Sequence, residues 1–228
     1  PDVNIVTIED PIEYQLPRVN QTQVKPEIGL TFGTGLRSIV RQDPDIVMVG
    51  EIRDKETAGL AINAALTGHL VLSTLHTNSA AGAIPRLLDM GAEPFLVVST
   101  VNVVIAQRLI RRLTKSREKY FLTEAEIKKL GQNIDLARVL KLLHEERILP
   151  VEQKDWLKIP FYRPRASEEA PDGYLGRSGI QEVLQLSPAL KEAVKSGATD
   201  VAITAQAKKE GMYSMIEDGV YKAVQGIT

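Results

Sequence analysis

The sequence predicts an open α/β sheet followed by a mostly helical C-terminal lobe. Short apolar runs, rich in β-branched residues, alternate with helical patterns over the first half of the chain. The connections between these segments are short, which favours a mostly parallel sheet with crossover helices. After Leu113 the chain becomes more charged and its periodicity is helical. We therefore expect a core over residues 1–113 and a second lobe over residues 114–228.

In the core, strands and helices are expected to alternate in chain order. The continuous apolar run Ile-Val-Met-Val before Gly50 is typical of a strand that is buried on both faces of a parallel sheet. Prolines limit two of the other segments, since Pro11 follows the first strand and Pro44 follows the first helix. The expected strands are residues 4–8, 46–49 and 70–75, of which the last two are expected to be buried. The expected helices are residues 36–42, 55–66, 79–90 and 94–113.

The second lobe is expected to be held by helices. Residues 123–149 are helical in pattern, and Thr123 with Glu126 forms a capping-box signature at their start. The Pro- and Gly-rich residues 158–177 predict a loop or β-turn segment. The end of the chain predicts three short helices with breaks near Gly197 and Gly211.

Composition excludes several classes of function. The 228 residues contain no cysteine and carry a net charge of −1, so disulfides, thiolate metal sites and a general attraction to nucleic acid or anionic lipid are not expected. The basic residues between Arg108 and Lys119 lack interleaved aromatics and favour a solvated face or a subunit contact over nucleic acid. The apolar segment 95–106 is interrupted by polar residues and is too short to span a bilayer. Without a signal peptide in view, we expect a soluble intracellular protein.

Polar side chains gather after the predicted strands, where open α/β sheets bind their ligands. Glu9, Asp10 and Glu13 follow the first strand, Glu51 and Arg53 follow the second, and His76 follows the third. Carboxylates suit magnesium, and they can also orient or deprotonate an attacking water. Acids in such positions are also common turn formers and helix caps, so the pattern alone leaves both interpretations open.

The histidines differ in position. His69 and His76 bracket the third strand and should lie about 23 Å apart, so both cannot contact one small ligand. His76 is expected at the ligand side, where it could donate to a phosphate. His69 follows Gly68 at the start of the strand and is more typical of packing or capping, while His144 belongs to a helix surface.

Three segments resemble known motifs. IVTIEDPIEY at residues 5–14 resembles the aspartate box of type II secretion and type IV pilus assembly ATPases, RQDPDIVMVGEIRDKET at 41–57 their Walker B segment, and TGHLVLSTLHTNSA at 67–80 their histidine box. The resemblance continues at 106–109 and 173–179 and is weakest at 114–164. It implies a RecA-like P-loop NTPase core and a hexameric motor that uses ATP and Mg²⁺.

The resemblance also implies roles for individual residues. Glu9 would activate the attacking water, Glu51 would be the Walker B acid acting through magnesium and its waters, and His76 would contact the γ-phosphate. The remaining candidates are cofactor-binding or supporting residues: Asp10, Glu13, Asp45, His69 and Arg53. Arg37 and Arg41, like Arg53, could hold crevice loops or the subunit interface, and surface salt bridges are an equal alternative for all three.

Two features depart from the family pattern. No Gly-x-x-x-x-Gly-Lys-Ser/Thr is present, and the glycine-rich residues 29–35 carry no lysine. In the family this phosphate loop precedes the aspartate box, so we expect it before Pro1 and expect the 228 residues alone to be inactive. The two Cys-x-x-Cys pairs of many members correspond here to Thr114, Arg117, Ala166 and Glu169, so zinc is not expected.

The resulting hypothesis is a fragment of a hexameric motor that drives type II secretion or type IV pilus assembly. Its expected partners are further copies of itself, an inner-membrane platform protein and cytoplasmic secretion or pilus proteins, with no nucleic acid. It would be cytoplasmic and peripheral to the inner membrane. The alternatives are a non-catalytic ring scaffold or docking module, and a related DNA-uptake or conjugation motor.

Overall fold

The computed structural model describes residues 2–228, which form two compact units. Unit 1 extends to Val104 and includes Leu184–Lys209, and unit 2 comprises Ile105–Val183 and Glu210–Thr228. The predicted boundary at residue 113 differs from the first boundary between these units, which follows Val104. Residues 184–209 were predicted in the second lobe and belong to unit 1. That segment belongs to unit 1 because its first helix packs against a helix of the core.

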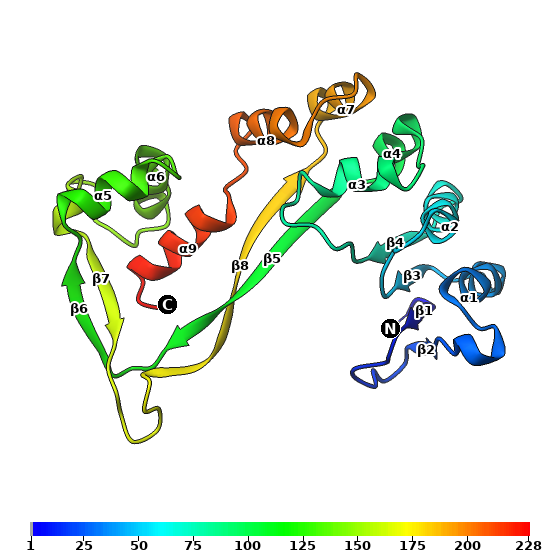
Figure 1. Ribbon diagram of the computed structural model, residues 1–228, viewed down its shortest axis with the longest axis horizontal. Helices are drawn as coiled ribbons and strands as arrows, with labels where there is room; N and C mark the ends of the chain where they lie inside the picture. The colour runs from blue at the N-terminus through cyan, green and yellow to red at the C-terminus, as the bar shows by residue number, and fades with distance from the viewer. Residues whose placement is uncertain (1) are drawn as a thin grey trace. The chain divides into compact units, whose positions relative to one another are not determined.

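Unit 1 is built on a four-stranded parallel sheet in the order β2-β1-β3-β4 (Figure 1). Its strands are β1 (Ile5–Glu9), β2 (Asn20–Gln23), β3 (Ile46–Val49) and β4 (Leu70–Ser73). Its helices are α1 (Phe32–Ile39), α2 (Lys55–Leu66), α3 (Ala83–Asp89), α4 (Pro94–Thr100), α7 (Pro188–Lys195) and α8 (Asp200–Lys209), with short 3-10 turns at Pro26–Ile28 and Val40–Gln42. This arrangement confirms the predicted parallel α/β core.

Strand register divides the sheet residues between two faces. Val6 and Ile8 of β1 lie beside Val47 and Val49 of β3, and all four are buried in a cluster with residues of α1 and α2. On the other face, Ile5, Thr7, Ile46, Met48, Leu70 and Leu72 lie in register across β1, β3 and β4. This second face is covered only in part, since Leu70 is 54% exposed and Leu72 is 50% exposed. The predicted burial of residues 70–75 is therefore wrong within this chain, because Leu70 and Leu72 lie on the face opposite to the cluster formed with α1 and α2.

The first α-helices match the sequence prediction to different degrees. α2 occupies the expected residues 55–66, because the side chain of Asp54 caps it by accepting from the backbone N–H of Thr57 at 2.8 Å. α1 begins four residues earlier than predicted, where Thr31 and Thr34 form a capping box. α3 begins only at Ala83, because the preceding residues form a turn in which Ser79 accepts from the N–H of Gly82.

The predicted helix at residues 94–113 is wrong in its second half. α4 ends at Thr100, and β5 (Val103–Leu113) follows and pairs with β8 (Tyr174–Gln185) in a two-stranded sheet. The β-branched residues Val103, Val104 and Ile105 lose side-chain freedom in a helix and favour a strand. β8 also begins inside the predicted loop at 158–177, and another strand, β7 (Pro160–Pro164), occupies part of it.

Unit 2 contains strands as well as helices. β6 (Arg117–Phe121) pairs antiparallel with β7 (Pro160–Pro164), and α5 (Glu124–Gly131), α6 (Leu136–Glu145), a 3-10 turn at Trp156–Lys158 and α9 (Met215–Val224) complete it. Its core is a cluster that includes Val139, Leu143, Ile159, Phe161 and Val224. The predicted Thr123–Glu126 capping box starts α5.

The C-terminal helices follow the predicted pattern of breaks. α7, α8 and α9 are separated at Gly197 and Gly211, whose φ angles of 76° and 109° lie in the left-handed region that glycine tolerates best. No helix among residues 2–228 is both long enough and apolar enough to cross a bilayer.

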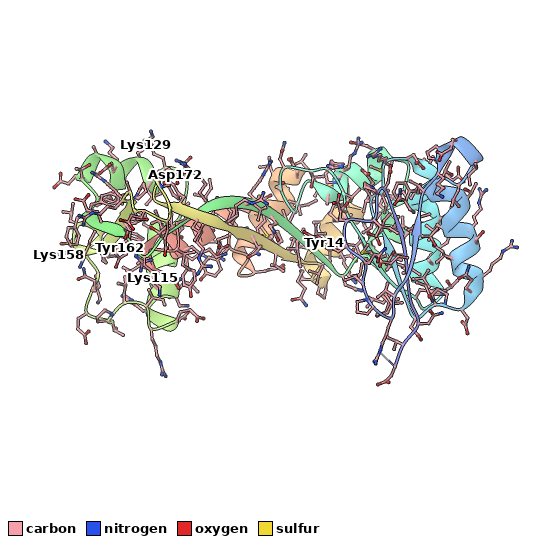
Figure 2. The ribbon with its side chains drawn as sticks, turned by 90° about the horizontal axis from the view of Figure 1, so that it is seen from below. Tyr14, Lys115, Lys129, Lys158, Tyr162 and Asp172 are labelled. Atoms are coloured by element: carbon pink, nitrogen blue, oxygen red, sulfur yellow. The ribbon has the colours of Figure 1, made fainter. Side chains whose placement is uncertain are left out.

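At the expected cysteine positions other contacts are found. Arg117 Nη1 donates to the carbonyl of Gly226, and its guanidinium lies 4.6 Å from the ring centre of Tyr162, which Figure 2 labels. The backbone N–H of Thr114 donates to the carbonyl of Gly173 at 3.1 Å. The contacts of Arg117 join β6 to β7 and to the residues that follow α9.

Candidate functional site

The carboxyl ends of β1, β3 and β4 meet at one edge of the sheet, which we call the rim. The N–H of Gly50 donates to the carbonyl of Ile8 at 2.7 Å, and the hydroxyl of Thr74 donates to the carbonyl of Gly50 at 2.6 Å. A Cβ atom at Gly50 would lie 3.1 Å from the Ile8 carbonyl oxygen and 3.3 Å from Cα of Glu9. Glycine at this position therefore lets the ends of β1 and β3 approach closely.

Glu51 lies at the centre of the rim, directly after Gly50. The residue is only 8% exposed, and its two carboxylate oxygens accept from two different cationic or polar groups. Nη2 of Arg53 lies 2.5 Å from Oε1, and Nε2 of His76 donates to Oε2 at 3.0 Å. Arg53 and His76 are themselves largely exposed. The structure therefore brings together three of the predicted site residues.

The electrostatics of Glu51 follow from these partners. The hydrogen bond from the Arg53 guanidinium is the largest cause that holds the pKa of Glu51 below its ordinary value. Burial acts in the opposite direction, and the contact with His76 adds to the lowering. In turn, Glu51 raises the pKa of Arg53, and the charge of Asp10 contributes a smaller increase. Glu51 is thus held as a carboxylate with a fixed orientation.

Glu9, the last residue of β1, is also at the rim. Its Oε1 accepts from the hydroxyl of Thr7 at 2.6 Å and from Nε2 of Gln21 at 2.9 Å. No hydrogen bond to Oε2 is found among the described residues, so this oxygen can accept from a ligand or a water. The sequence analysis missed Gln21, although the polar alternation of Gln21 and Gln23 on a short strand was a signal for an exposed edge beside the site.

Four other candidates lie away from Glu51. Asp10 and Glu13 are exposed on the loop after β1, where Asp10 acts on Arg53 only through its charge. Asp45 accepts from the backbone N–H of Asn4 at 2.6 Å at the amino end of the strands, so it holds a loop and does not support the rim. Arg37 pairs with Glu56 at 3.0 Å, and both side chains are more than half exposed, which is the surface salt bridge expected as the alternative.

The contacts of His69 favour the packing or capping role over cofactor binding. His69 lies at the amino end of β4, opposite to His76, as its position in the sequence predicts. Its Nδ1 lies 2.9 Å from the carbonyl oxygen of Ala64 and 3.1 Å from the hydroxyl of Thr67, at the end of α2. In this chain His69 is therefore a capping residue that holds α2 to β4. His144 likewise has a structural contact, to the carbonyl of Gln153 at 2.8 Å.

The glycine-rich segment at residues 29–35 has a packing role. Gly33 and Gly35 belong to α1, and both are buried. A Cβ atom at Gly35 would lie 2.1 Å from Cδ1 of Ile8, so its absence lets α1 lie close to β1. The segment therefore positions β1, and with it Glu9, and does not form a phosphate-binding loop.

A separate cavity of about 500 Å³ is found in unit 2. It lies between α6, β8 and α9, and its wall includes Leu142, Val183, Tyr213 and Tyr221. None of the predicted site residues lines it. The wall also carries the polar side chains of Glu146, Gln181 and Asp218, and it is separate from the rim.

Comparison with known proteins identifies the family. The family model described as type II/IV secretion system protein matches residues 1–228. The chain belongs to this family. Among its relatives, type II secretion system protein E of Xanthomonas campestris is 51% identical over 228 residues, which are all of this chain and 37% of that protein. The type IV pilus assembly ATPase PilB of Thermus thermophilus is 44% identical over 232 residues, which cover all of this chain and 24% of that protein.

The chain therefore spans about a quarter to two fifths of the length of these family members. Solved structures support the fold. The chain is similar to the Legionella pneumophila ATPase DotB with a TM-score of 0.59 and 21% identity, over 99% of this chain and 48% of that one. It is also similar to the pilus retraction motor PilT bound to ADP, with a TM-score of 0.54 and 24% identity, over 96% of this chain and 52% of that one. The chain thus shares the fold of these ATPases, in agreement with the RecA-like core that the motif resemblance implies.

The rim carries two carboxylates of the kind that can bind a divalent cation. Glu51 and Glu9 present carboxylate oxygens, which are the ligands that Mg²⁺ prefers. No cluster of three or more acidic or histidine side chains that could hold a metal exists among residues 2–228. Mg²⁺ in nucleotide sites commonly takes only one or two carboxylates and completes its shell with water and phosphate oxygens. The two glutamates fit that arrangement and do not fit a metal cage made of protein alone.

Proposed function

We propose that this chain is the Walker B and histidine-box part of a motor ATPase whose complete protein hydrolyses ATP with Mg²⁺ to drive type II secretion or type IV pilus assembly. The observation that carries the proposal is the convergence of Arg53 and His76 on Glu51, with Glu9 at the end of the neighbouring strand. The names of the relatives support the same class of reaction.

The complete protein would need to supply the phosphate loop, and the open parts of the sheet indicate where. All-parallel sheets are normally covered on both faces. Here the outer edge of β4 has no partner strand among residues 2–228. The exposed Leu70 and Leu72 lie on the face of the sheet that neither α1 nor α2 covers. A strand beside β4 followed by a helix over this face would fill both openings. A phosphate loop is a strand–loop–helix unit of that kind.

In the proposed reaction each rim residue has a distinct task. The free Oε2 of Glu9 accepts a proton from the water that attacks the γ-phosphate. Glu51 orients waters of the metal shell, and Mg²⁺, when bound, neutralises charge on the transferring phosphoryl group. His76, which is largely exposed beside Glu51, would donate to an oxygen of the γ-phosphate. Arg53 keeps Glu51 ionised and oriented while it does so.

The proposal extends to assembly and location. Such a motor would form a homo-hexamer, in which a neighbouring subunit completes each site, and would act on a platform protein of the inner membrane and on cytoplasmic secretion or pilus proteins. It would lie in the cytoplasm at the membrane surface. A second candidate, a non-catalytic ring scaffold or docking module, is favoured by one observation. Both oxygens of Glu51 already have protein partners, as in a purely structural carboxylate.

The substitution Glu51→Gln in the full-length protein separates the two candidates. Glutamine keeps the shape of the side chain and removes its charge, so ATP turnover should fall by about 10² to 10⁴-fold if Glu51 serves the reaction. Glu56→Gln is the matched control, because Glu56 is an exposed glutamate in α2 whose partner is Arg37, and it should keep wild-type turnover. Full activity of the Glu51→Gln protein, or no activity of the wild type, would contradict the proposal.

A further inference from the structure

One side chain of β2 makes three hydrogen bonds beside Glu9. The amide nitrogen of Gln21 donates to Oε1 of Glu9 at 2.9 Å and to the carbonyl of Tyr14 at 3.0 Å. Its amide oxygen accepts from the backbone N–H of Leu16 at 2.7 Å. Gln21 therefore joins the Glu9 carboxylate to the loop of residues 10–19, with two donors and one acceptor engaged.

Strand pairing explains why this residue reaches Glu9. Gln21 lies opposite Thr7 in the parallel register of β1 and β2, and Gln23 lies opposite Glu9. Side chains two residues apart lie on the same face of a strand, so Thr7, Glu9 and Gln21 share one face of the sheet. Thr7 and Gln21 then approach the same oxygen of Glu9, one along β1 and one from the neighbouring strand.

We infer that Gln21 is a positioning residue that aims the Glu9 carboxylate and links its orientation to the 10–19 loop. The inference rests on the proposed function, because Glu9 is the group through which Gln21 would act. With Oε1 held by Gln21 and Thr7, Oε2 is the oxygen that faces a ligand. The loop presents Tyr14, which is 81% exposed and labelled in Figure 2. A shift of the backbone at Tyr14 or Leu16 would be transmitted to Glu9 through a single side chain.

Two substitutions of Gln21 in the full-length protein test this role. Gln21→Glu keeps the shape but removes both N–H donors and places a negative charge against Glu9. Gln21→Ala removes the link altogether. Loss of alignment at a reacting group commonly costs about 10 to 100-fold in rate. We expect kcat for ATP hydrolysis to fall by that factor, with the KM for ATP unchanged within about twofold, because Gln21 acts on the reacting group and not on nucleotide binding.

Gln23 provides a matched control on the same strand and face. Its amide oxygen accepts from the N–H of Ile12 at 3.4 Å, so it holds the same loop without a hydrogen bond to Glu9. Gln23→Ala should keep kcat within about twofold of the wild type. An equal fall in kcat for the Gln21 and Gln23 variants would overturn the inference, since it would show that only the fold of the loop matters. A rise in KM at unchanged kcat for the Gln21 variants would overturn it too.

The variant Glu9→Gln distinguishes failure of this inference from failure of the proposed function. If Glu9→Gln abolishes turnover and the Gln21 variants keep wild-type kcat, the proposed function stands and the positioning role of Gln21 is wrong. If Glu9→Gln keeps wild-type turnover, Glu9 is not the catalytic carboxylate and both statements fall. The inference is supported when Glu9→Gln is inactive, the Gln21 variants are slow and Gln23→Ala is not.

Discussion

Two glycines at the start of β8 should respond very differently to the same substitution by alanine. Gly173 and Gly176 both have left-handed backbone conformations, with φ angles of 74° and 72°. A Cβ atom at Gly176 would meet nothing within 4 Å, whereas one at Gly173 would lie 2.7 Å from the backbone nitrogen of Arg165 and 2.8 Å from Cβ of Pro164. Substitution by alanine therefore carries the same backbone cost at both positions, and only at Gly173 does the new side chain also collide with its neighbours.

The expected destabilisation follows from these two terms. An alanine in the left-handed region costs about 1 kcal/mol relative to glycine, and this should be the whole effect of Gly176→Ala. Gly173→Ala must in addition move the backbone at Arg165, since that neighbour is not a flexible side-chain end. Such overpacking costs typically about 1–3 kcal/mol. We therefore expect the free energy of unfolding of unit 2 to fall by roughly 2–4 kcal/mol in Gly173→Ala.

The fluorescence of Trp156 in the 228-residue chain provides the assay. It is the only tryptophan of the sequence and lies in the core of unit 2, with an exposure of 8%. Urea titration followed at this residue therefore reports on the unit that contains both glycines. Equal shifts of the transition for the two variants would refute the close packing of Gly173 against Arg165.

Two further predictions concern Glu51. Because the hydrogen bond from Arg53 holds the pKa of Glu51 below its ordinary value of 4.5, the ionised side chain stabilises the folded state above about pH 4.5, and this contribution is lost as the pH falls through the lowered folded-state pKa. Acid unfolding of the chain can be followed by circular dichroism. The loss of stability between about pH 4.5 and the lowered pKa should be smaller in Glu51→Gln than in the wild type, and an unchanged profile would contradict this prediction. Arg53→Ala should also increase the rate of amide hydrogen exchange in β3 and at the start of α2 more than Arg37→Ala does. The reason is that Arg53 pairs with the largely buried carboxylate of Glu51, whereas Arg37 pairs with the exposed carboxylate of Glu56. Equal exchange rates in the two variants would show that burial of Glu51 has no effect.

Local patterns were sufficient for much of unit 1. The β-branched run of β1, the apolar run of β3 and the cap at Asp54 are all encoded within a few residues, and each element formed where it was expected. The rule that ligands bind at the carboxyl ends of parallel strands was sufficient to bring Glu51, Arg53 and His76 together. It also separated His76 from His69, although the motif resemblance had grouped them.

Features that depend on distant partners could not be predicted. Residues 94–113 form a helix and then a strand, and the β-branched residues near Val103 favour the change only locally. Pairing of the second half with β8, about seventy residues later in the chain, completes the strand. Gln21 reaches Glu9 across two strands that are separated by a loop, so nothing adjacent in the sequence signals the contact. The exposure of Leu70 and Leu72 likewise reflects what lies beside β4, which the four residues of that strand do not encode.

The central claim is that Glu9, Glu51 and His76 serve one nucleotide. The most direct measurement is an experimental structure of the full-length protein with Mg²⁺ and a non-hydrolysable ATP analogue. It should place His76 within hydrogen-bond distance of the γ-phosphate, Glu51 on the metal or its waters, and Oε2 of Glu9 on a water in line with the γ-phosphate. A triphosphate bound elsewhere, with these three side chains still paired only to protein groups, would contradict the account.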